Sequence, residues 1–218
     1  MSKSNAGRIG VWGRSGSGKS SYIKKRIAGQ RRVIVFDPLE EYAAEGFIAI
    51  RGGLDAVRVA MRDNWRGFRL AYVPPSGREA RALSGLSRLL MSAQQPAKDN
   101  GGGAGLTLVL EEMNLSFPVH GGEAKAPGFA EICSRGRHYG IEVIGASQRI
   151  AEVSTRFRGN GTETVVFAQK GPRDLAAAAA ELGCDPAKVK ALVNLSYIHE
   201  KAGAITSGKL TFNKSAKK

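Results

Sequence analysis

The sequence predicts an α/β fold in which a mainly parallel central sheet is flanked by helices. Short apolar runs of strand length alternate with segments of helical periodicity from residue 8 to residue 193. The run at residues 106–110 reads LTLVL, and such a near-continuous apolar stretch is typical of a parallel strand buried on both faces. After it, alternation around Gly203 and Gly208 within residues 197–212 indicates a terminal β-hairpin.

Strands are expected where β-branched and apolar residues cluster and a turn signal follows. The expected strands are residues 8–12, 32–36, 47–51, 68–73, 106–112, 141–148 and 162–170. Helices are expected where apolar residues recur at three- and four-residue spacing, as Leu83, Leu86 and Leu90 do. The expected helices are residues 20–28, 54–64, 76–92, 129–139, 150–157, 172–182 and 185–193.

Two interior segments, residues 94–105 and 114–128, are rich in glycine, proline and polar residues and are predicted to be loops. The first is expected to be a loop rather than a domain linker, because the motifs on both sides of it must meet in one site. We therefore expect one domain over residues 8–213, with a frayed start at residues 1–7 and a basic tail at residues 214–218.

The composition excludes several classes of protein. A chain of 218 residues with 42% hydrophobic residues can bury a substantial core. No apolar run approaches the length of a membrane span, and no signal peptide is visible, so a soluble intracellular protein is expected. Cys133 and Cys184 lie far apart without a C-x-x-C pattern, and the three histidines are scattered, so neither a disulfide framework nor a transition-metal site is expected.

The chain is strongly basic, with a net charge of +14. A polyanion partner accounts for this excess, with nucleic acid favoured over membrane, although simple solubility is an alternative. All eight basic residues between Arg51 and Arg88 are arginine, and Arg58 and Arg62 lie one helical turn apart. This arginine-rich stretch is a candidate surface for contact with DNA phosphates or with a second subunit. The alternative is a helix face exposed to solvent.

Residues 13–20 read GRSGSGKS and match G-x-x-x-x-G-K-[ST] between an apolar run and a helical segment. The glycines let successive backbone N–H groups approach phosphate oxygens, and the start of the helix adds unpaired N–H groups. Lys19 is placed to bridge the β- and γ-phosphates of a nucleotide, and the Ser20 hydroxyl to bind Mg²⁺. The candidate nucleotide-binding residues are Gly13, Arg14, Ser15, Gly16, Ser17, Gly18, Lys19 and Ser20.

Acidic and polar side chains follow three of the expected strands. Glu111 and Glu112 follow residues 106–110, and in P-loop enzymes such a pair supports Mg²⁺ and polarises the attacking water. Two surface acids after a strand are the alternative. Residues 141–148 end in Gln148, at the edge where phosphates are expected to lie. Asp37 follows residues 32–36, as either a site residue or a turn-forming one.

The order of these parts resembles a known family. The run RHYGIEVIGASQR at residues 137–149, then AEVS at 151–154 and VVF at 165–167, resembles the region that follows the Walker B strand in FtsK/HerA DNA-translocating ATPases. Together with the motifs above, the resemblance covers residues 8–170. It implies a P-loop NTPase fold of the ASCE, RecA-like type. In its small size, the chain further resembles the compact genome-packaging ATPases of tailless, double-jelly-roll viruses with internal membranes.

The resemblance also implies roles for individual residues. Glu111 occupies the Walker B position that supports Mg²⁺, and Glu112 is the catalytic base. Gln148 is the polar sensor of the γ-phosphate. Arg137 is the arginine finger that reaches across a subunit interface, with Arg135 and Arg149 as rivals.

Two positions depart from the family pattern. Glu111 stands where an aspartate is usual, and its longer side chain leaves the second-shell geometry around Mg²⁺ open. Ile150 replaces the proline that often follows the Gln-Arg pair, a change that leaves the chemistry untouched.

The implied function is ATP-driven translocation of viral genomic DNA into a preformed capsid, with ATP and Mg²⁺ bound at the subunit interfaces of a homo-oligomeric ring, taken as a hexamer. DNA would be held through its backbone without sequence recognition. Capsid or portal-vertex proteins would be further partners, at the packaging vertex of the virion and in the host cytoplasm. The alternatives are a small P-loop kinase of nucleotide metabolism, a non-hydrolysing DNA-binding or virion protein, and a filamentous-phage-type DNA export ATPase.

Overall fold

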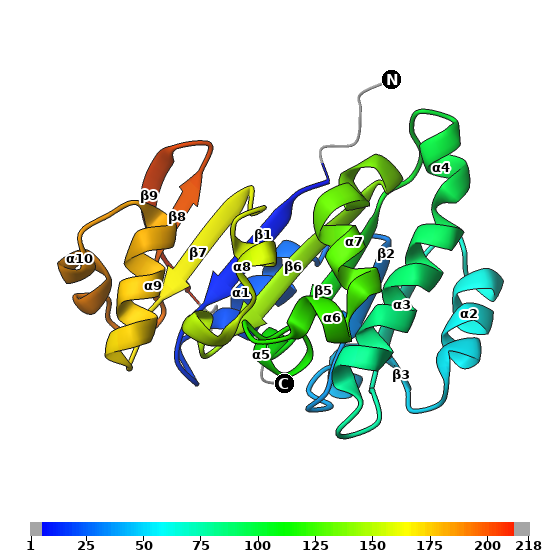
Figure 1. Cartoon of the computed structure of the whole chain (residues 1–218), viewed down its shortest axis with the longest axis horizontal. Coiled ribbons are helices and arrows are strands. Elements are labelled where there is room, and N and C mark those ends of the chain that lie inside the picture. Colours follow the sequence, from blue (N-terminus) through cyan, green and yellow to red (C-terminus); the bar gives the residue numbers. More distant parts are fainter. Residues whose placement is uncertain (1–5, 212–218) are drawn as a thin grey trace.

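The computed structural model describes residues 6–211 (Figure 1). The predicted basic tail at residues 214–218 and most of the predicted frayed start lie outside this range. Within it, one sheet has the strand order β3-β4-β2-β5-β6-β1-β7-β8-β9. The strands are β1 (Arg8–Trp12), β2 (Arg32–Phe36), β3 (Ile48–Ile50), β4 (Phe68–Tyr72), β5 (Leu106–Leu110), β6 (Ile141–Ser147), β7 (Glu163–Phe167), β8 (Ser196–Lys201) and β9 (Ala204–Lys209).

Strands β1 to β7 are all parallel, whereas β8 and β9 add an antiparallel hairpin at one end. The predicted fold class, the seven predicted strands and the C-terminal hairpin are confirmed. Parallel neighbours in a sheet must be joined by long crossover connections, and the helices form these connections. The helices are α1 (Lys19–Arg26), α2 (Leu54–Asp63), α3 (Glu79–Ala93), α4 (Gln95–Asp99), α5 (Met113–Ser116), α6 (Gly122–Lys125), α7 (Pro127–Arg135), α8 (Thr155–Arg158), α9 (Pro172–Leu182) and α10 (Pro186–Lys190), with the 3₁₀ turns η1 (Ala43–Glu45), η2 (Gly136–Tyr139) and η3 (Ile150–Glu152).

The prediction of a loop over residues 94–105 is wrong, because this segment contains helix α4 and packs against η2. The Gln94 side chain is buried, and its amide nitrogen donates to the carbonyl oxygens of Tyr139 at 2.9 Å and Ala104 at 3.2 Å. These two hydrogen bonds close the segment into a compact turn. A buried amide with such distant partners cannot be recognised from local composition.

The prediction of a loop over residues 114–128 is also wrong, because helices α5 and α6 form there. Phe117 and Ala126 are fully buried, and the Phe117 ring packs edge-on against Phe129 at a centroid distance of 4.9 Å. The helix predicted over residues 150–157 is divided into η3 and α8, since Val153 between them pairs as an isolated β-bridge with Pro118.

The sheet separates two hydrophobic cores. In β2 the side chains of Ile34 and Phe36 join one core, and Val33 and Val35 join the other, as the two-residue period of a strand requires. Helices α2, α3, α7 and α9 cover the first core and lie in front of the sheet in Figure 1, whereas α1 lies behind it. Both faces of the sheet are therefore covered, which explains the apolar character of its central strands.

The strand order also positions the site. Strand β6 lies between β1 and β5, and all three run parallel. Their carboxyl ends consequently share one edge of the sheet, and the segments that follow them meet there. The phosphate-loop motif follows β1, the two glutamates follow β5, and Gln148 follows β6.

A glycine pair makes room for a large side chain just before the phosphate-loop motif. Gly10 of β1 lies opposite Gly145 of β6, and a Cβ placed on Gly10 would lie 2.4 Å from the Trp12 ring. Trp12 is only 1% exposed and packs edge-on against Phe157. The ring therefore occupies the space that a larger residue at position 10 would need.

We expect Gly10→Ala to lower the free energy of unfolding by about 1–3 kcal/mol, because a rigid indole must move to admit the methyl group. Chemical denaturation followed by circular dichroism measures the change. Gly29→Ala is the matched control, since a Cβ there meets nothing within 4 Å and its φ is not in the left-handed region. Equal stability of the two variants would contradict this account of the packing.

Candidate active site

The loop between β1 and α1 has a backbone that only glycine adopts readily. Gly16 and Gly18 have φ values of 69° and 112°, in or beyond the left-handed region. Gly13 is restricted by space instead, because a Cβ there would lie 2.6 Å from the Cβ of Phe167. The glycines of the motif thus fix the path of the loop around the start of α1.

The start of α1 and the loop above it fit a polyphosphate. No side chain caps the helix at Gly18, and no acid occupies its first turn. The Ser17 hydroxyl is buried and has no hydrogen-bond partner within the described residues. Unpaired N–H groups, a free hydroxyl and the positive end of a helix are the groups that bind phosphate. Ser20 lies half-buried in the first turn of α1, where its hydroxyl would be near a Mg²⁺ ion carried by the phosphates.

Lys19 is held inside this loop. It is 7% exposed, and its ammonium group donates to the carbonyl oxygen of Arg14 at 3.3 Å. Burial lowers the pKa of Lys19, while the nearby charges of Glu112 and Glu111 act in the opposite direction. The lysine and both predicted acids therefore lie within electrostatic reach of one another.

Glu111 is a buried carboxyl group, 4% exposed. The Tyr42 hydroxyl donates to Glu111 Oε1 at 2.6 Å. Burial raises the pKa of Glu111 to about 7, although the Tyr42 hydrogen bond and Lys19 lower it. Sequence reasoning missed Tyr42, which is separated from Glu111 by 69 positions in the chain.

Asp37 explains how Tyr42 reaches this position. Its two carboxylate oxygens accept hydrogen bonds from the backbone N–H of Glu41 at 3.0 Å and of Tyr42 at 2.9 Å. These bonds turn the chain after β2 and direct Tyr42 toward the end of β5. Of the two interpretations left open by the sequence, Asp37 is the turn-forming residue.

Glu112 and Gln148 form a hydrogen-bonded pair. The Gln148 side-chain amide donates to Glu112 Oε1 at 2.7 Å. Glu112 also has φ of 42°, a left-handed conformation that is uncommon for a residue with a side chain. Strained positions of this kind concentrate at functional sites. The predicted base and the predicted sensor are thus in direct contact.

The end of β6 is connected to the rest of the site. The Gly13 N–H donates to the Ser147 carbonyl oxygen at 3.3 Å, which links the phosphate loop to β6. The Ser147 hydroxyl donates to Asn114 Oδ1 in α5 at 2.7 Å. The segment before Gln148 is therefore fixed from two sides.

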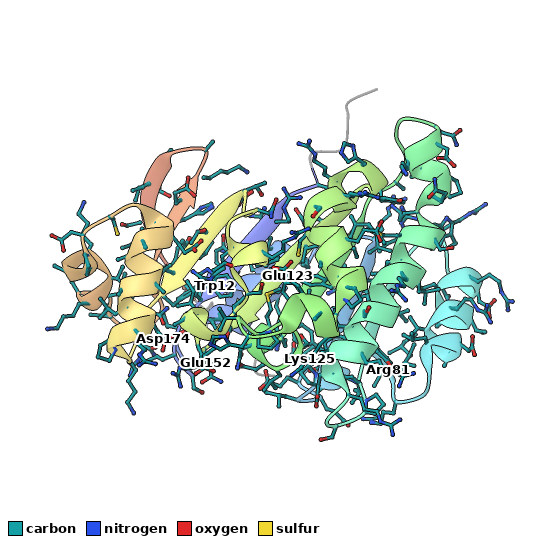
Figure 2. The ribbon with its side chains drawn as sticks, in the orientation of Figure 1. Trp12, Arg81, Glu123, Lys125, Glu152 and Asp174 are labelled. Carbon is teal, nitrogen blue, oxygen red and sulfur yellow. The ribbon has the colours of Figure 1, made fainter. Side chains whose placement is uncertain are left out.

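The three candidate arginines have different surroundings. Arg149 forms ion pairs with Asp174 at 2.9 Å and Glu152 at 2.8 Å, and Figure 2 shows these two acids close together at the lower edge of the molecule. Arg135 pairs with Glu131 at 3.3 Å. Arg137 lies in η2, just before β6 begins, and has no ion pair among residues 6–211.

Arg137 therefore lies at the edge of the sheet opposite its own phosphate loop, because η2 precedes the parallel strand β6. It cannot serve the site of its own subunit from there. This location is compatible with a role in trans.

Comparison with solved structures decides the fold. B204, the genome-packaging NTPase of Sulfolobus turreted icosahedral virus 2, superposes in its AMPPCP complex with a TM-score of 0.73 at 17% identity, over 95% of this chain and 98% of that one. This chain has the B204 fold. The DNA-packaging ATPase B204 of Sulfolobus turreted icosahedral virus matches at 0.71 and 18% identity, over 96% and 100% of the two chains.

The B204 fold also extends to VirB4 of Thermoanaerobacter pseudethanolicus, with a TM-score of 0.70 and 12% identity, over 95% of this chain and 90% of that one. No family model and no curated protein matches the sequence. The fold implied by the FtsK/HerA resemblance is confirmed by these structures. Within residues 6–211, no helix combines the length and apolar character that crossing a bilayer demands.

Tyr42→Phe tests the newly found contact. We expect it to lower the free energy of unfolding by about 1–3 kcal/mol, because Glu111 loses its hydrogen bond in a buried place. It is also expected to raise the Mg²⁺ concentration needed for half-maximal ATP hydrolysis. Thermal denaturation and a Mg²⁺ titration measure the two effects. Tyr22→Phe is the control, since the Tyr22 ring packs against Phe167 without contacting Glu111. A Tyr42→Phe variant that matched this control in both assays would refute the role.

Proposed function

We propose that this chain is an ATPase that binds ATP and Mg²⁺ at the carboxyl edge of its sheet and uses hydrolysis to move DNA. The observation that carries the proposal is the convergence of Lys19, Glu111 and the Glu112–Gln148 pair at that edge. A strand inserted between the phosphate-loop strand and the acid-bearing strand places Gln148 beside Glu112. A nucleotide on the loop would present its terminal phosphate to this pair.

Each residue then has a distinct task. Residues 13–20 bind the phosphates, with Lys19 neutralising their charge. The Ser20 hydroxyl and Glu111 would hold Mg²⁺, which would supply positive charge to the bound phosphates. Glu112 accepts the proton of the attacking water. Gln148 orients the Glu112 carboxylate through the hydrogen bond between them.

The coupling to DNA is supported by fold and charge. B204 has the same fold, is a genome-packaging NTPase and has been solved with AMPPCP and ATP-gammaS. The net charge of +14 suits a partner held by its phosphates. The proposed assembly is a hexameric ring around DNA, with capsid or portal-vertex proteins as further partners. It would act at the packaging vertex during virion assembly in the host cell.

The proposed ring assigns Arg137 to the site of the neighbouring subunit, as the arginine that stabilises charge on the transferring phosphoryl group. We expect Arg137→Ala to reduce hydrolysis by about 10³-fold or more. Mixing this variant with Glu112→Gln subunits should restore part of the activity, because some interfaces then combine an intact Arg137 with an intact Glu112. Steady-state hydrolysis at several mixing ratios measures the rescue. Absence of rescue would argue against a role in trans, and Arg135→Ala serves as the neighbouring control.

The proposed function is tested first by steady-state ATP hydrolysis with and without duplex DNA, at two salt concentrations. We expect stimulation by DNA that weakens as salt rises, because phosphate contacts release counterions. Hydrolysis that is indifferent to DNA, together with phosphotransfer to a small soluble acceptor, would instead indicate a P-loop kinase. Absence of hydrolysis with nucleotide still bound would indicate a non-hydrolysing protein.

A further inference from the structure

A cavity lined by several charged side chains lies at the opposite edge of the sheet from the phosphate loop. It has a volume of about 610 Å³ and opens between the amino ends of β2, β5 and β6. These strands are parallel, so their amino ends lie a full strand length away from Lys19 and Glu112. The side chains that give this amino-edge cavity its chemistry are Gln30, Arg31, Arg32, Trp65, Arg66 and Glu142.

Arg32 is a buried charge without a counter-ion. Its side chain is 6% exposed, its Nε donates to the Gly105 carbonyl oxygen at 3.1 Å, and its guanidinium lies 4.5 Å from the centre of the Trp65 ring. Across the described range 6–211, no carboxylate approaches it within ion-pair distance. Burial lowers the pKa of Arg32 for this reason. A buried cation in this state is stabilised when an anion enters beside it.

Gln30 adds a second unsatisfied group to the same cavity. Its side-chain nitrogen donates to Glu142 Oε2 at 3.0 Å, which fixes the orientation of the amide. The Gln30 Oε1 atom is then buried without a hydrogen-bond partner among the described residues. A buried acceptor without a partner is uncommon in folded proteins, and an N–H donor from a bound molecule would satisfy it.

The remaining charges favour an anionic ligand. Arg31 and Arg66 are exposed at the rim, and neither forms an ion pair within the part of the chain that the structure describes. Glu142 is the opposing charge, but it already accepts hydrogen bonds from Gln30 and, at 3.4 Å, from the Thr107 hydroxyl. Three arginines therefore face one engaged carboxylate.

We propose that the amino-edge cavity is a second binding site for a nucleotide, separate from the phosphate loop. Arg31, Arg32 and Arg66 bind its phosphate, and Gln30 Oε1 accepts a hydrogen bond from an N–H group of its base. The volume suits a ligand of this size. The nucleotide is either free or part of an unpaired strand, since a base within a duplex is stacked and paired and does not enter a cavity.

The test uses the intrinsic fluorescence of the full chain carrying Lys19→Ala, so that the phosphate loop does not compete. The chain has two tryptophans, of which Trp12 is 1% and Trp65 39% exposed, so quenching by a soluble quencher reports on Trp65. The probes are AMP, a short single-stranded oligonucleotide, the matching duplex and inorganic phosphate. We expect AMP or the single strand to protect Trp65 from quenching at lower concentration than phosphate does.

Two double variants then locate the site. Arg31→Gln with Arg66→Gln should weaken binding by at least about tenfold, because two charge-assisted hydrogen bonds are lost. Arg78→Gln with Arg81→Gln removes the same charge from the opposite edge, where Figure 2 shows Arg81, and should leave binding unchanged. Gln30→Leu should weaken AMP but not phosphate.

The binding results distinguish a free nucleotide, an unpaired strand and general charge attraction. Tighter binding of AMP than of the oligonucleotide would support a free nucleotide as the ligand, and the reverse would support an unpaired strand. Equal loss in both double variants would overturn the site in favour of general charge attraction. Equal affinity for AMP and phosphate, or protection by duplex alone, would also overturn it. Because the Lys19→Ala background does not rely on ATP hydrolysis, these results are independent of the proposed ATPase function.

Discussion

Glu112→Gln is expected to slow ATP hydrolysis by about 10²- to 10⁴-fold while nucleotide still binds. Glutamine has nearly the same shape as glutamate, so the contact with Gln148 at the end of β6 survives in altered form. The glutamine side chain cannot accept the proton of an attacking water at neutral pH. ATP binding should persist, because the phosphate loop is unchanged in this variant. Only the hydrolysis step should be lost. Single-turnover hydrolysis and equilibrium binding of ATP measure the two effects separately.

Glu123→Gln is the matched control for this variant. Glu123 is an exposed residue of α6 that pairs with Arg156 at 3.5 Å (Figure 2). It should retain the hydrolysis rate of the unmodified chain. Equal rates in the two glutamine variants would remove Glu112 from the chemistry, and loss of ATP binding in Glu112→Gln would show that it acts on the loop instead.

Lys19→Met is expected to weaken ATP binding by about 100-fold or more, because charge-assisted hydrogen bonds to the phosphates are lost. Without nucleotide, the same change should not reduce stability. Lys19 is 7% exposed, and burial opposes its charge, so methionine of similar length fills the space without that cost. Isothermal calorimetry and chemical denaturation of the nucleotide-free protein test the two statements. Lys25→Met, on the same helix but exposed, is the control.

The lowered pKa of Lys19 gives this prediction a dependence on pH. Below the ordinary value of 10.5, the unfolded chain binds the Lys19 proton more tightly than the folded chain. Stability therefore rises as pH increases between the lowered pKa and 10.5. The difference in free energy of unfolding between Lys19→Met and the unmodified chain should shrink over this window. A difference that stayed constant with pH would mean that Lys19 is not desolvated in the folded state.

Much of this fold was predictable because its signals are local. The apolar runs that become β1, β2 and β5 and the motif at residues 13–20 each depend on a few neighbouring residues. The meeting of Lys19 with Glu112 followed from strand polarity alone, since carboxyl ends of parallel strands share an edge. Such features do not depend on the details of side-chain packing.

The parts that escaped prediction depend on contacts between distant segments. Tyr42 lies in a loop of ordinary composition, and only the turn formed by Asp37 carries it to Glu111. The composition of the Gly- and Pro-rich stretch after α3 predicts a loop. The buried Gln94 side chain instead holds this stretch against η2 by a hydrogen bond to the Tyr139 carbonyl oxygen. Arg149 ends the run at residues 137–149 that resembles a known family. Its ion pair with Asp174 depends instead on the packing of α9, which the run does not predict. A pattern of apolar residues predicts which side chains are buried, but it does not predict which polar groups contact one another.

Three consecutive residues at the end of β6 contact three different parts of the molecule. Ser147 joins the phosphate loop through its carbonyl oxygen, Gln148 joins the base Glu112, and Arg149 joins the first turn of α9 through Asp174. A peptide chain cannot lengthen, so a displacement of Gln148 toward a terminal phosphate must be shared by its two neighbours. Helix α9 packs beside β7 and leads to the terminal hairpin. The end of β6 is thus connected to the phosphate loop on one side and, through α9, to the segment that leads to the hairpin at the far end of the sheet.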